Sequence, residues 1–210
     1  IHAYKHRETG AYALMCGEGA AFRSDGQING TNGRFEPNAR IATLVESPTE
    51  IVGHAITAQG TVDAALSRLD RSEWEPAVKQ GDPVVKLHIP ADGKMNPELC
   101  LDSYRRALDF FARYFPETSY ETFFCETWLL APQWKTLLPE PSNIVQFGRV
   151  FRPFPILAND MQTFERVFDG KPADLSTAPK DTLLRRVLVE HLQAGGVVHN
   201  GAGFIFKNTL

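Results

Sequence analysis

The segment between residues 83 and 116 constrains the fold of this chain more than any other. Residues 84–89 are mostly apolar and stop at Pro90, as expected of a buried strand. A short polar loop follows, and a helix then begins at Pro97 with Asn96 as its N-cap. Apolar side chains recur along that helix at three- and four-residue spacing until Pro116 ends it. The order strand, loop, helix indicates an α/β unit.

This junction is also the first place to expect binding. A strand that leads into a helix N-terminus often forms an anion site, because free backbone N–H groups and the helix dipole converge there. His88 lies two residues before the strand stops at Pro90. We therefore expect any chemistry of this chain to lie near the end of this strand.

The same pattern continues downstream. Residues 121–130 are rich in aromatic and apolar side chains and predict a second buried strand. A short helix is expected over 132–138, and a third strand over 143–151. Strand, helix, strand, helix, strand favours a partly parallel sheet, because crossover helices join parallel strands. We expect the strands at 84–89 and 123–130 to be parallel neighbours.

The regions on either side are less regular. Residues 1–82 are predicted to be β-rich, with 61–70 compatible with strand or helix and 74–78 favouring a short helix. Residues 152–179 are rich in proline and polar side chains, which predicts partly irregular structure. The ordered elements expected after them are a helix over 182–194, ended by Gly195, and a closing strand over 201–206.

Composition limits the possible partners. The chain has 210 residues, of which 43% are hydrophobic, so it can bury a sizeable core. Lys and Arg number 22 against 25 Asp and Glu, and a net charge of −3 without a basic run argues against nucleic acid. No apolar run approaches the ~18 residues of a membrane span, so we expect no membrane partner. Three cysteines without a C-x-x-C pair favour reduced thiols and a cytoplasmic location.

A metal site is not expected. His2 and His6 have the i, i+4 spacing of a helical ligand pair, but they lie at the start of the chain, outside any predicted helix. Neither a phosphate-binding G-x-x-x-x-G-K-[ST] loop nor a G-x-S-x-G nucleophile motif occurs.

Several short motifs occur in an order typical of one family. They are LHIP at 87–90, CETWLL at 125–130, SNI at 142–144 followed by Phe147 and Phe151, and the glycines of 195–203. Together they resemble the GNAT-like C-terminal domain of bacterial acyltransferase-domain-containing proteins, within the GNAT N-acyltransferase superfamily. The resemblance runs from about residue 12 to residue 205. Those proteins carry a separate N-terminal domain, so an upstream domain is expected here too.

The resemblance implies a mixed, twisted α/β sheet flanked by helices. In that fold the sheet splays open between its fourth and fifth strands, matched here by 84–89 and 123–130, and acyl-CoA enters the gap. Residues 1–82 would then form the β-rich half of the domain, and 83–210 the half that binds acyl-CoA. The residues expected to hold the acyl-CoA phosphates are Ile89, Pro90, Ala91, Gly93, Lys94 and Asn96. The family's loop has more glycines, and Asp92 would repel a phosphate.

The implied activity is N-acyl transfer. An amine of a small-molecule or peptide acceptor would attack the thioester of acetyl-CoA or another acyl-CoA directly. A lysine-like amine, with a pKa of about 10.4, is mostly protonated at pH 7, so a base must take a proton. Two residues are candidates for this base. His88 lies at the end of one strand, and Glu126 lies beside the splay on the other, where strand alternation separates it from Cys125 and Thr127.

Other interpretations stay open. His88 could be a hydrogen-bonded structural histidine, and Glu126 a solvated surface residue. Trp128 and Trp134 could line an acyl or acceptor pocket or belong to the core. Cys125 could be the nucleophile of a thiol hydrolase, although its apolar neighbours indicate a buried, inert thiol. Finally, the domain could be a degenerate, non-catalytic relative that binds acyl-CoA or packs on a partner domain.

Overall fold

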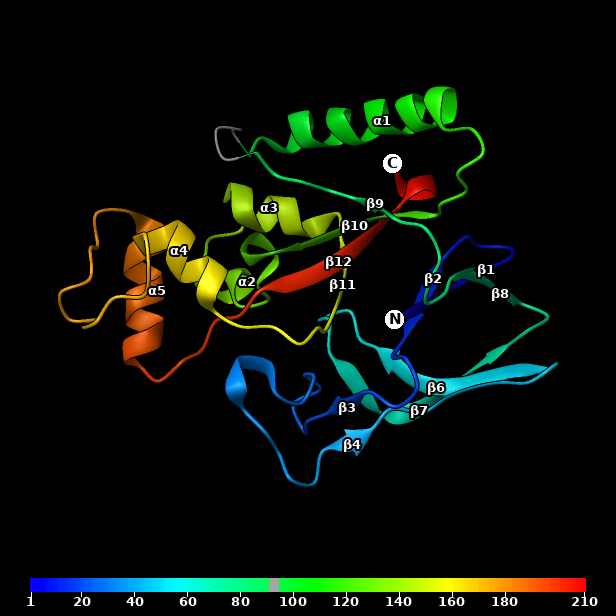
Figure 1. The fold of residues 1–210 in the computed structure, drawn as a ribbon, viewed down its shortest axis with the longest axis horizontal. Helices are drawn as coiled ribbons and strands as arrows, with labels where there is room; N and C mark the ends of the chain where they lie inside the picture. The colour runs from blue at the N-terminus through cyan, green and yellow to red at the C-terminus, as the bar shows by residue number, and fades with distance from the viewer. Residues whose placement is uncertain (91–94) are drawn as a thin grey trace.

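The computed structural model describes residues 1–90 and 95–210 and contains two main β-sheets (Figure 1). The first sheet has the strand order β5-β6-β2-β1-β8, and β7 pairs with β6 outside this path. Its strands are β1 (His2–His6), β2 (Tyr12–Met15), β5 (Leu44–Glu46), β6 (Glu50–Ile56), β7 (Val62–Asp70) and β8 (Trp74–Val78). A separate two-stranded ribbon and a short 3-10 helix lie beside it: β3 (Ala21–Phe22), β4 (Arg40–Ile41) and η1 (Thr31–Gly33).

The second sheet has the order β11-β12-β10-β9. Its strands are β9 (Val85–Lys86), β10 (Thr122–Thr127), β11 (Arg152–Phe154) and β12 (Gly201–Phe206). β9 and β10 are parallel neighbours, with Val85 opposite Phe123, which confirms the central prediction from the sequence. β12 is antiparallel to both β10 and β11.

Helices flank the second sheet. They are α1 (Pro97–Tyr114), η2 (Trp128–Leu130), α2 (Trp134–Leu137), α3 (Asn143–Arg149), α4 (Met161–Phe168), α5 (Leu183–Gln193) and η3 (Lys207–Thr209). α1 begins as predicted, with Asn96 as N-cap and Pro97 in the first turn. α5 and β12 also agree with the prediction, and Gly195 follows α5 with a φ of +82°, the left-handed conformation that a glycine adopts at low cost.

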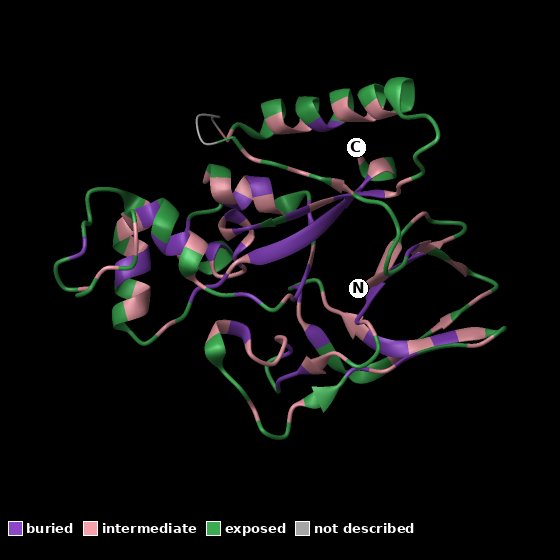
Figure 2. Ribbon diagram, in the orientation of Figure 1, coloured by how far each residue is buried: buried purple, intermediate pink, exposed green. Residues whose placement is uncertain are grey.

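The two faces of the second sheet pack against different layers. On one face, Phe123 and Ile205 pack with Tyr104 of α1 and Phe147 of α3. On the other face, aromatic side chains including Phe204 pack against the first sheet. Strand alternation produces this division, because successive side chains point to opposite faces. β12 therefore lies between two apolar cores and is buried along its whole length (Figure 2).

The structure corrects two predicted elements. The strand predicted over 143–151 is wrong, because the segment forms α3, whose N-cap Ser142 accepts a hydrogen bond from the Val145 N–H. The helix predicted over 74–78 is also wrong, since the segment is β8 and pairs antiparallel with β1. In both cases a short apolar run is compatible with a helix or a strand, and the N-cap or the partner strand determines which of the two forms.

Other segments differ in extent. The ambiguous 61–70 segment is the strand β7, paired with β6. The strand predicted over 84–89 has only two paired residues, and the strand predicted over 121–130 ends at Thr127, where η2 begins. The segment 152–179 contains β11 and α4 within otherwise irregular chain.

Candidate functional site

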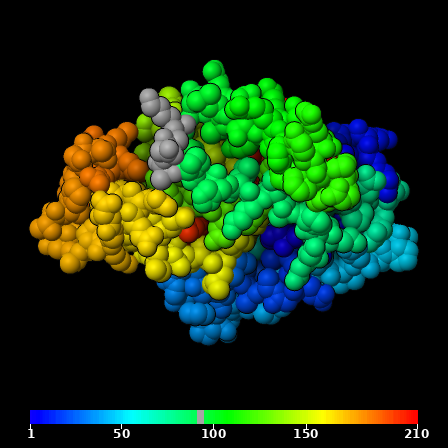
Figure 3. Space-filling view, turned by 45° about the horizontal axis from the view of Figure 1, so that its top comes forward, coloured from blue at the N-terminus to red at the C-terminus, as the bar shows by residue number. Residues whose placement is uncertain are grey.

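A cleft opens where β9 and β10 separate. The Leu87 N–H still donates to the Phe124 carbonyl oxygen at 2.8 Å, but in the described residues no hydrogen bond joins 88–90 to β10. The resulting space of about 490 Å³, which we call the β9–β10 cleft, has walls from residues 86–90, from 125–129 and from α4. Figure 3 shows the green segment with β9 and the yellow segment with α4 on one face of the molecule.

The two candidate bases lie on this cleft. His88 lines it from the segment that follows β9, and Glu126 lines it from β10. Both residues are exposed, and neither side chain has a hydrogen-bond partner among residues 1–90 and 95–210. Cys125 and Thr127 are buried on either side of Glu126, as alternation predicts.

Cys125 borders the same cleft but is poorly suited to act as a nucleophile. It is 1% exposed, and burial raises the pKa of its thiol to about 11, although the Lys86 ammonium opposes this rise. At pH 7 only about one such thiol in 10⁴ is ionised, and the thiolate is the reactive form. The structure therefore favours the inert interpretation of Cys125 over a thiol hydrolase.

The two tryptophans occupy different environments. Trp128 lines the β9–β10 cleft, and its backbone N–H donates to the Gln162 side-chain oxygen at 2.8 Å. Trp134 does not line this cleft: it is 1% exposed, packs edge-on against Trp128, and donates its indole N–H to the Trp128 carbonyl oxygen at 2.7 Å. Trp134 thus supports the wall that carries Trp128.

Sequence reasoning missed the contribution of α4. Gln162 and Arg166 of this helix both line the β9–β10 cleft, as does Lys86 of β9. The i, i+4 spacing of Gln162 and Arg166 places them on one helix face, and this signal was available in the sequence. The proline-rich, polar composition of the segment 152–179 predicts irregular structure and so obscures the helical spacing within it. Lys86 and Arg166 make the cleft cationic on two sides.

The expected phosphate-binding residues are only partly described. Ile89 and Pro90 line the β9–β10 cleft, whereas Ala91, Asp92, Gly93 and Lys94 lie outside the described residues.

The Asn96 side chain already caps α1. Its oxygen accepts the N–H groups of Glu98 at 2.9 Å and Leu99 at 3.2 Å. Pro97 has no N–H, so the chain itself satisfies the first donors of α1. A phosphate could use these donors only by displacing Asn96.

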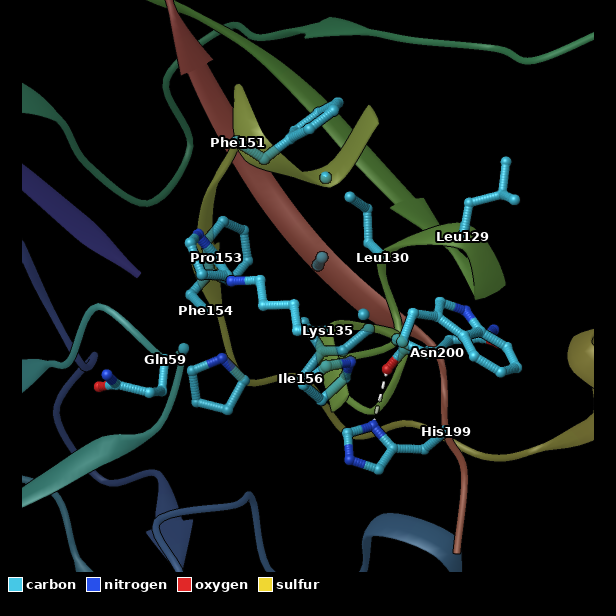
Figure 4. Close-up of a pocket in the computed structure, with 18 of the residues that line it drawn as sticks. Gln59, Leu129, Leu130, Lys135, Phe151, Pro153, Phe154, Ile156, His199 and Asn200 are labelled. Carbon is cyan, nitrogen blue, oxygen red and sulfur yellow. Dashed lines mark hydrogen bonds between the residues drawn. The ribbon is translucent and has the colours of Figure 1, made fainter. Parts of the chain in front are cut away.

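A second cavity, of about 40 Å³, lies next to the start of β12 (Figure 4). His199 is buried there, and its Nδ1 lies 2.8 Å from the Asn200 carbonyl oxygen, so Nδ1–H is the donor. Burial lowers the pKa of His199, which keeps the ring neutral at pH 7. The cavity has room for a few water molecules, at roughly 10–15 Å³ each. It is too small for a substrate, and His199 has a structural role there.

Residues 1–90 and 95–210 contain neither a metal site nor a membrane-spanning helix. No group of three or more His, Cys, Asp or Glu side chains there could hold a metal ion. None of the helices in this part of the chain is both long and apolar enough to cross a membrane.

A parallel strand pair that separates into a cleft, flanked by helices on a mixed sheet, defines a GNAT-like acyltransferase fold. A family model described as the GNAT-like C-terminal domain matches residues 26–205. The chain belongs to this family, which confirms the resemblance found in the sequence.

Solved structures of similar fold are acyltransferases with bound ligands. One, in complex with decanoyl-CoA, is 28% identical over 77% of this chain and 45% of that chain, with a TM-score of 0.55. A second, in complex with decanoyl-CoA and teicoplanin, is 26% identical over 74% of this chain and 44% of that one, with a TM-score of 0.56. A third contains CoA and 10C-teicoplanin, with 26% identity, 78% and 46% coverage, and a TM-score of 0.56.

The chain spans less than half the length of these solved structures. No match was found among curated proteins.

Proposed function

We propose that this protein is an N-acyltransferase that transfers an acyl group from acyl-CoA to an amine acceptor. The observation that carries the proposal is the β9–β10 cleft, which opens between two parallel strands and has His88 and Glu126 on its walls. Structures of similar fold with bound decanoyl-CoA or CoA support acyl-CoA as the co-substrate.

The walls of the cleft suit both parts of an acyl-CoA. Leu87, Ile89 and Trp128 provide apolar surface for the pantetheine arm and the acyl chain. Lys86 and Arg166 provide positive charge for phosphates, the second as a planar guanidinium that binds phosphate oxygens in pairs. We expect a chain of decanoyl length to bind more tightly than acetyl, because it buries more apolar area.

The chemistry requires a base and an oxyanion site. The amine nitrogen attacks the thioester carbon, the carbonyl oxygen becomes an oxyanion, and the C–S bond then breaks to release CoA thiolate. His88 or Glu126 takes a proton from the ammonium form of the acceptor and passes it to solvent, which frees the nitrogen lone pair for attack. The nitrogen loses a second proton after the attack, and that proton reaches the CoA sulfur as the thiolate leaves. The N–H group of Ile89 makes no hydrogen bond to the described chain and lies two residues after Leu87, whose N–H points to β10, so it can donate to the oxyanion. Such donors are commonly worth about 2.7–4 kcal/mol each.

Two substitutions test the base. If His88 is the base, H88A should lower the rate at pH 7 by ~10²–10⁴-fold, with partial rescue at high pH where the amine loses its proton unaided, and Glu126→Gln should have little effect. If Glu126 is the base, Glu126→Gln should lower the rate and H88A should have little effect. The assay is release of CoA thiol from decanoyl-CoA in the presence of a polyamine or a peptide amine, with mass spectrometry of the amide. Full activity in both variants would show that neither residue is the base.

One observation favours a second candidate, a non-catalytic domain that binds acyl-CoA or packs on a partner domain. Asn96 occupies the N–H groups at the start of α1, and the sequence has the acidic Asp92 within the segment that the family resemblance assigns to the phosphates. The same assay separates the two candidates. A protein that is stabilised by acyl-CoA but releases no thiol with any amine would be a binding domain.

The remaining predictions concern organisation. We propose that 1–82 and 83–210 act as two halves of one domain, because the first sheet ends before residue 82 and the second begins after residue 83. The upstream domain expected from the family stays a prediction. A cytoplasmic location is proposed because acyl-CoA is made there and the cysteines of this chain are free thiols.

A further inference from the structure

A second large cleft lies at the opposite edge of the second sheet, between that sheet and the first. It has a volume of about 610 Å³ and shares no lining residue with the β9–β10 cleft. The cleft exists because β11 pairs with β12 only from Ala202 to Phe204. Ile205 and Phe206 continue past the end of β11 and line the opening, which we call the edge cleft.

The edge cleft has an apolar floor. Tyr12 of β2 stacks on Phe206, with ring centroids 3.6 Å apart and planes 7° from parallel. Leu14 and Ile56 extend this surface from the first sheet. Burial raises the pKa of Tyr12 to about 12, so its phenol is uncharged at neutral pH. This floor can therefore cover an apolar tail.

The rim of the edge cleft is cationic. Lys135, Arg149 and Arg152 line it, and no Asp or Glu is among its described lining residues. Lys135 and Arg152 form no ion pair with the described chain, and Arg149 pairs only with Glu140, in a pair that is exposed on both sides. Exposed pairs contribute little free energy, so Arg149 can exchange Glu140 for another anion.

We propose that the edge cleft binds an amphiphilic anion, in which a single anionic group is attached to an apolar tail. The guanidinium groups of Arg149 and Arg152 suit a carboxylate or a phosphate ester, because both anions accept paired hydrogen bonds. The tail lies on Tyr12 and Phe206. The volume falls within the roughly 300–1,000 Å³ of small-molecule sites. The proposal does not depend on acyl transfer, because the two clefts are separate.

Calorimetric titration of the whole protein tests this site. Decanoate represents a fatty-acid carboxylate, decyl phosphate represents a phosphate ester, and decanol lacks the charge, with each probe kept below micelle-forming concentrations. We expect at least one anion to bind at 1:1 stoichiometry, and decanol to bind at least about tenfold more weakly, since a charge-assisted hydrogen bond is lost. The tighter anion identifies the head group. Equal affinity for decanol would overturn the proposal.

Two matched substitutions locate the binding. Arg152→Met removes a rim cation and should weaken anion binding about tenfold without changing CoA affinity. R166M removes a cation of the β9–β10 cleft and should weaken CoA binding without changing the affinity for the anion. Arg149→Met serves as a second rim variant if R152M changes the circular dichroism spectrum. Unchanged anion binding in both rim variants, or displacement of decanoate by CoA, would refute the assignment even if the protein transfers acyl groups normally.

Discussion

Replacing Asn96 separates its role as the cap of α1 from a role in binding phosphate. The Asn96 oxygen accepts two backbone N–H groups, at 2.9 and 3.2 Å. Loss of such a cap typically costs about 1 kcal/mol, within a range of roughly 0.5–2 kcal/mol. For a protein of this size, Asn96→Ala should therefore lower the melting temperature by about 2–4 °C.

The same substitution should not weaken CoA binding. If a phosphate has to displace the cap to reach the N–H groups of Glu98 and Leu99, the wild type loses the cap on binding and the variant does not. Asn96→Ala should then bind CoA about fivefold more tightly, which is a cap free energy of about 1 kcal/mol converted to an affinity. If phosphates bind elsewhere, the affinity should stay the same.

The assay pairs thermal unfolding with titration of CoA, and α5 supplies the control. Thr182 caps α5 by accepting the N–H of Arg185, away from the residues that line the β9–β10 cleft. Thr182→Ala should cost similar stability and leave CoA affinity unchanged. A severalfold loss of CoA affinity in Asn96→Ala alone would refute this reasoning and would make Asn96 a phosphate ligand.

Three further outcomes follow from buried groups. Cys125 should resist iodoacetamide in the folded protein at pH 7 and react readily in urea, and Cys125→Ser should keep acyl transfer. Rapid modification of the native thiol, seen by peptide mass spectrometry, would contradict the raised pKa of Cys125. Gly201→Ala should destabilise the fold by about 1–3 kcal/mol or more in urea unfolding, because a Cβ there would lie 1.8 Å from the Leu130 carbonyl oxygen. An unfolding midpoint equal to that of the wild type would show that the backbone shifts at little cost. Because burial lowers the pKa of His199 below 6.5, the unfolded state binds more protons than the folded state, and stability falls as the pH drops below about 6.5. His199→Gln should therefore reduce the slope of melting temperature against pH in this acidic range, and an unchanged slope would exclude His199 as the cause of the acid destabilisation.

Local signals explain why some elements were predictable from the sequence. The start of α1 is specified by Asn96 and Pro97, which act within one turn of the helix. The parallel pairing of β9 and β10 follows from the helix between them, and the family motifs give the same arrangement. The β9–β10 cleft, with His88 and Glu126 on it, could be anticipated for this reason.

The remaining features of the fold and of the site depend on contacts between residues that are far apart in the sequence. The segment 74–78 is a strand because β1, far away in the sequence, pairs with it, and no feature within 74–78 encodes that partner. The burial of Trp134 depends on packing between α2 and its neighbours. The placement of Arg166 on the cleft depends on how α4 docks, which the spacing of its polar residues indicates only in part.

The position of β12 has a consequence for synthesis of the protein. β12 follows every other strand in the chain, yet Phe204 belongs to the core against the first sheet and Ile205 to the core under α1. While residues 201–206 are still inside the ribosome, β10 lacks its partner strand. Phe123 and Phe124, which point to opposite faces of the sheet, then lack the side chains of Ile205 and Phe204 beside them. The nascent chain therefore exposes aromatic surface until residues 201–206 have left the ribosome, which makes it a natural client for ribosome-associated chaperones.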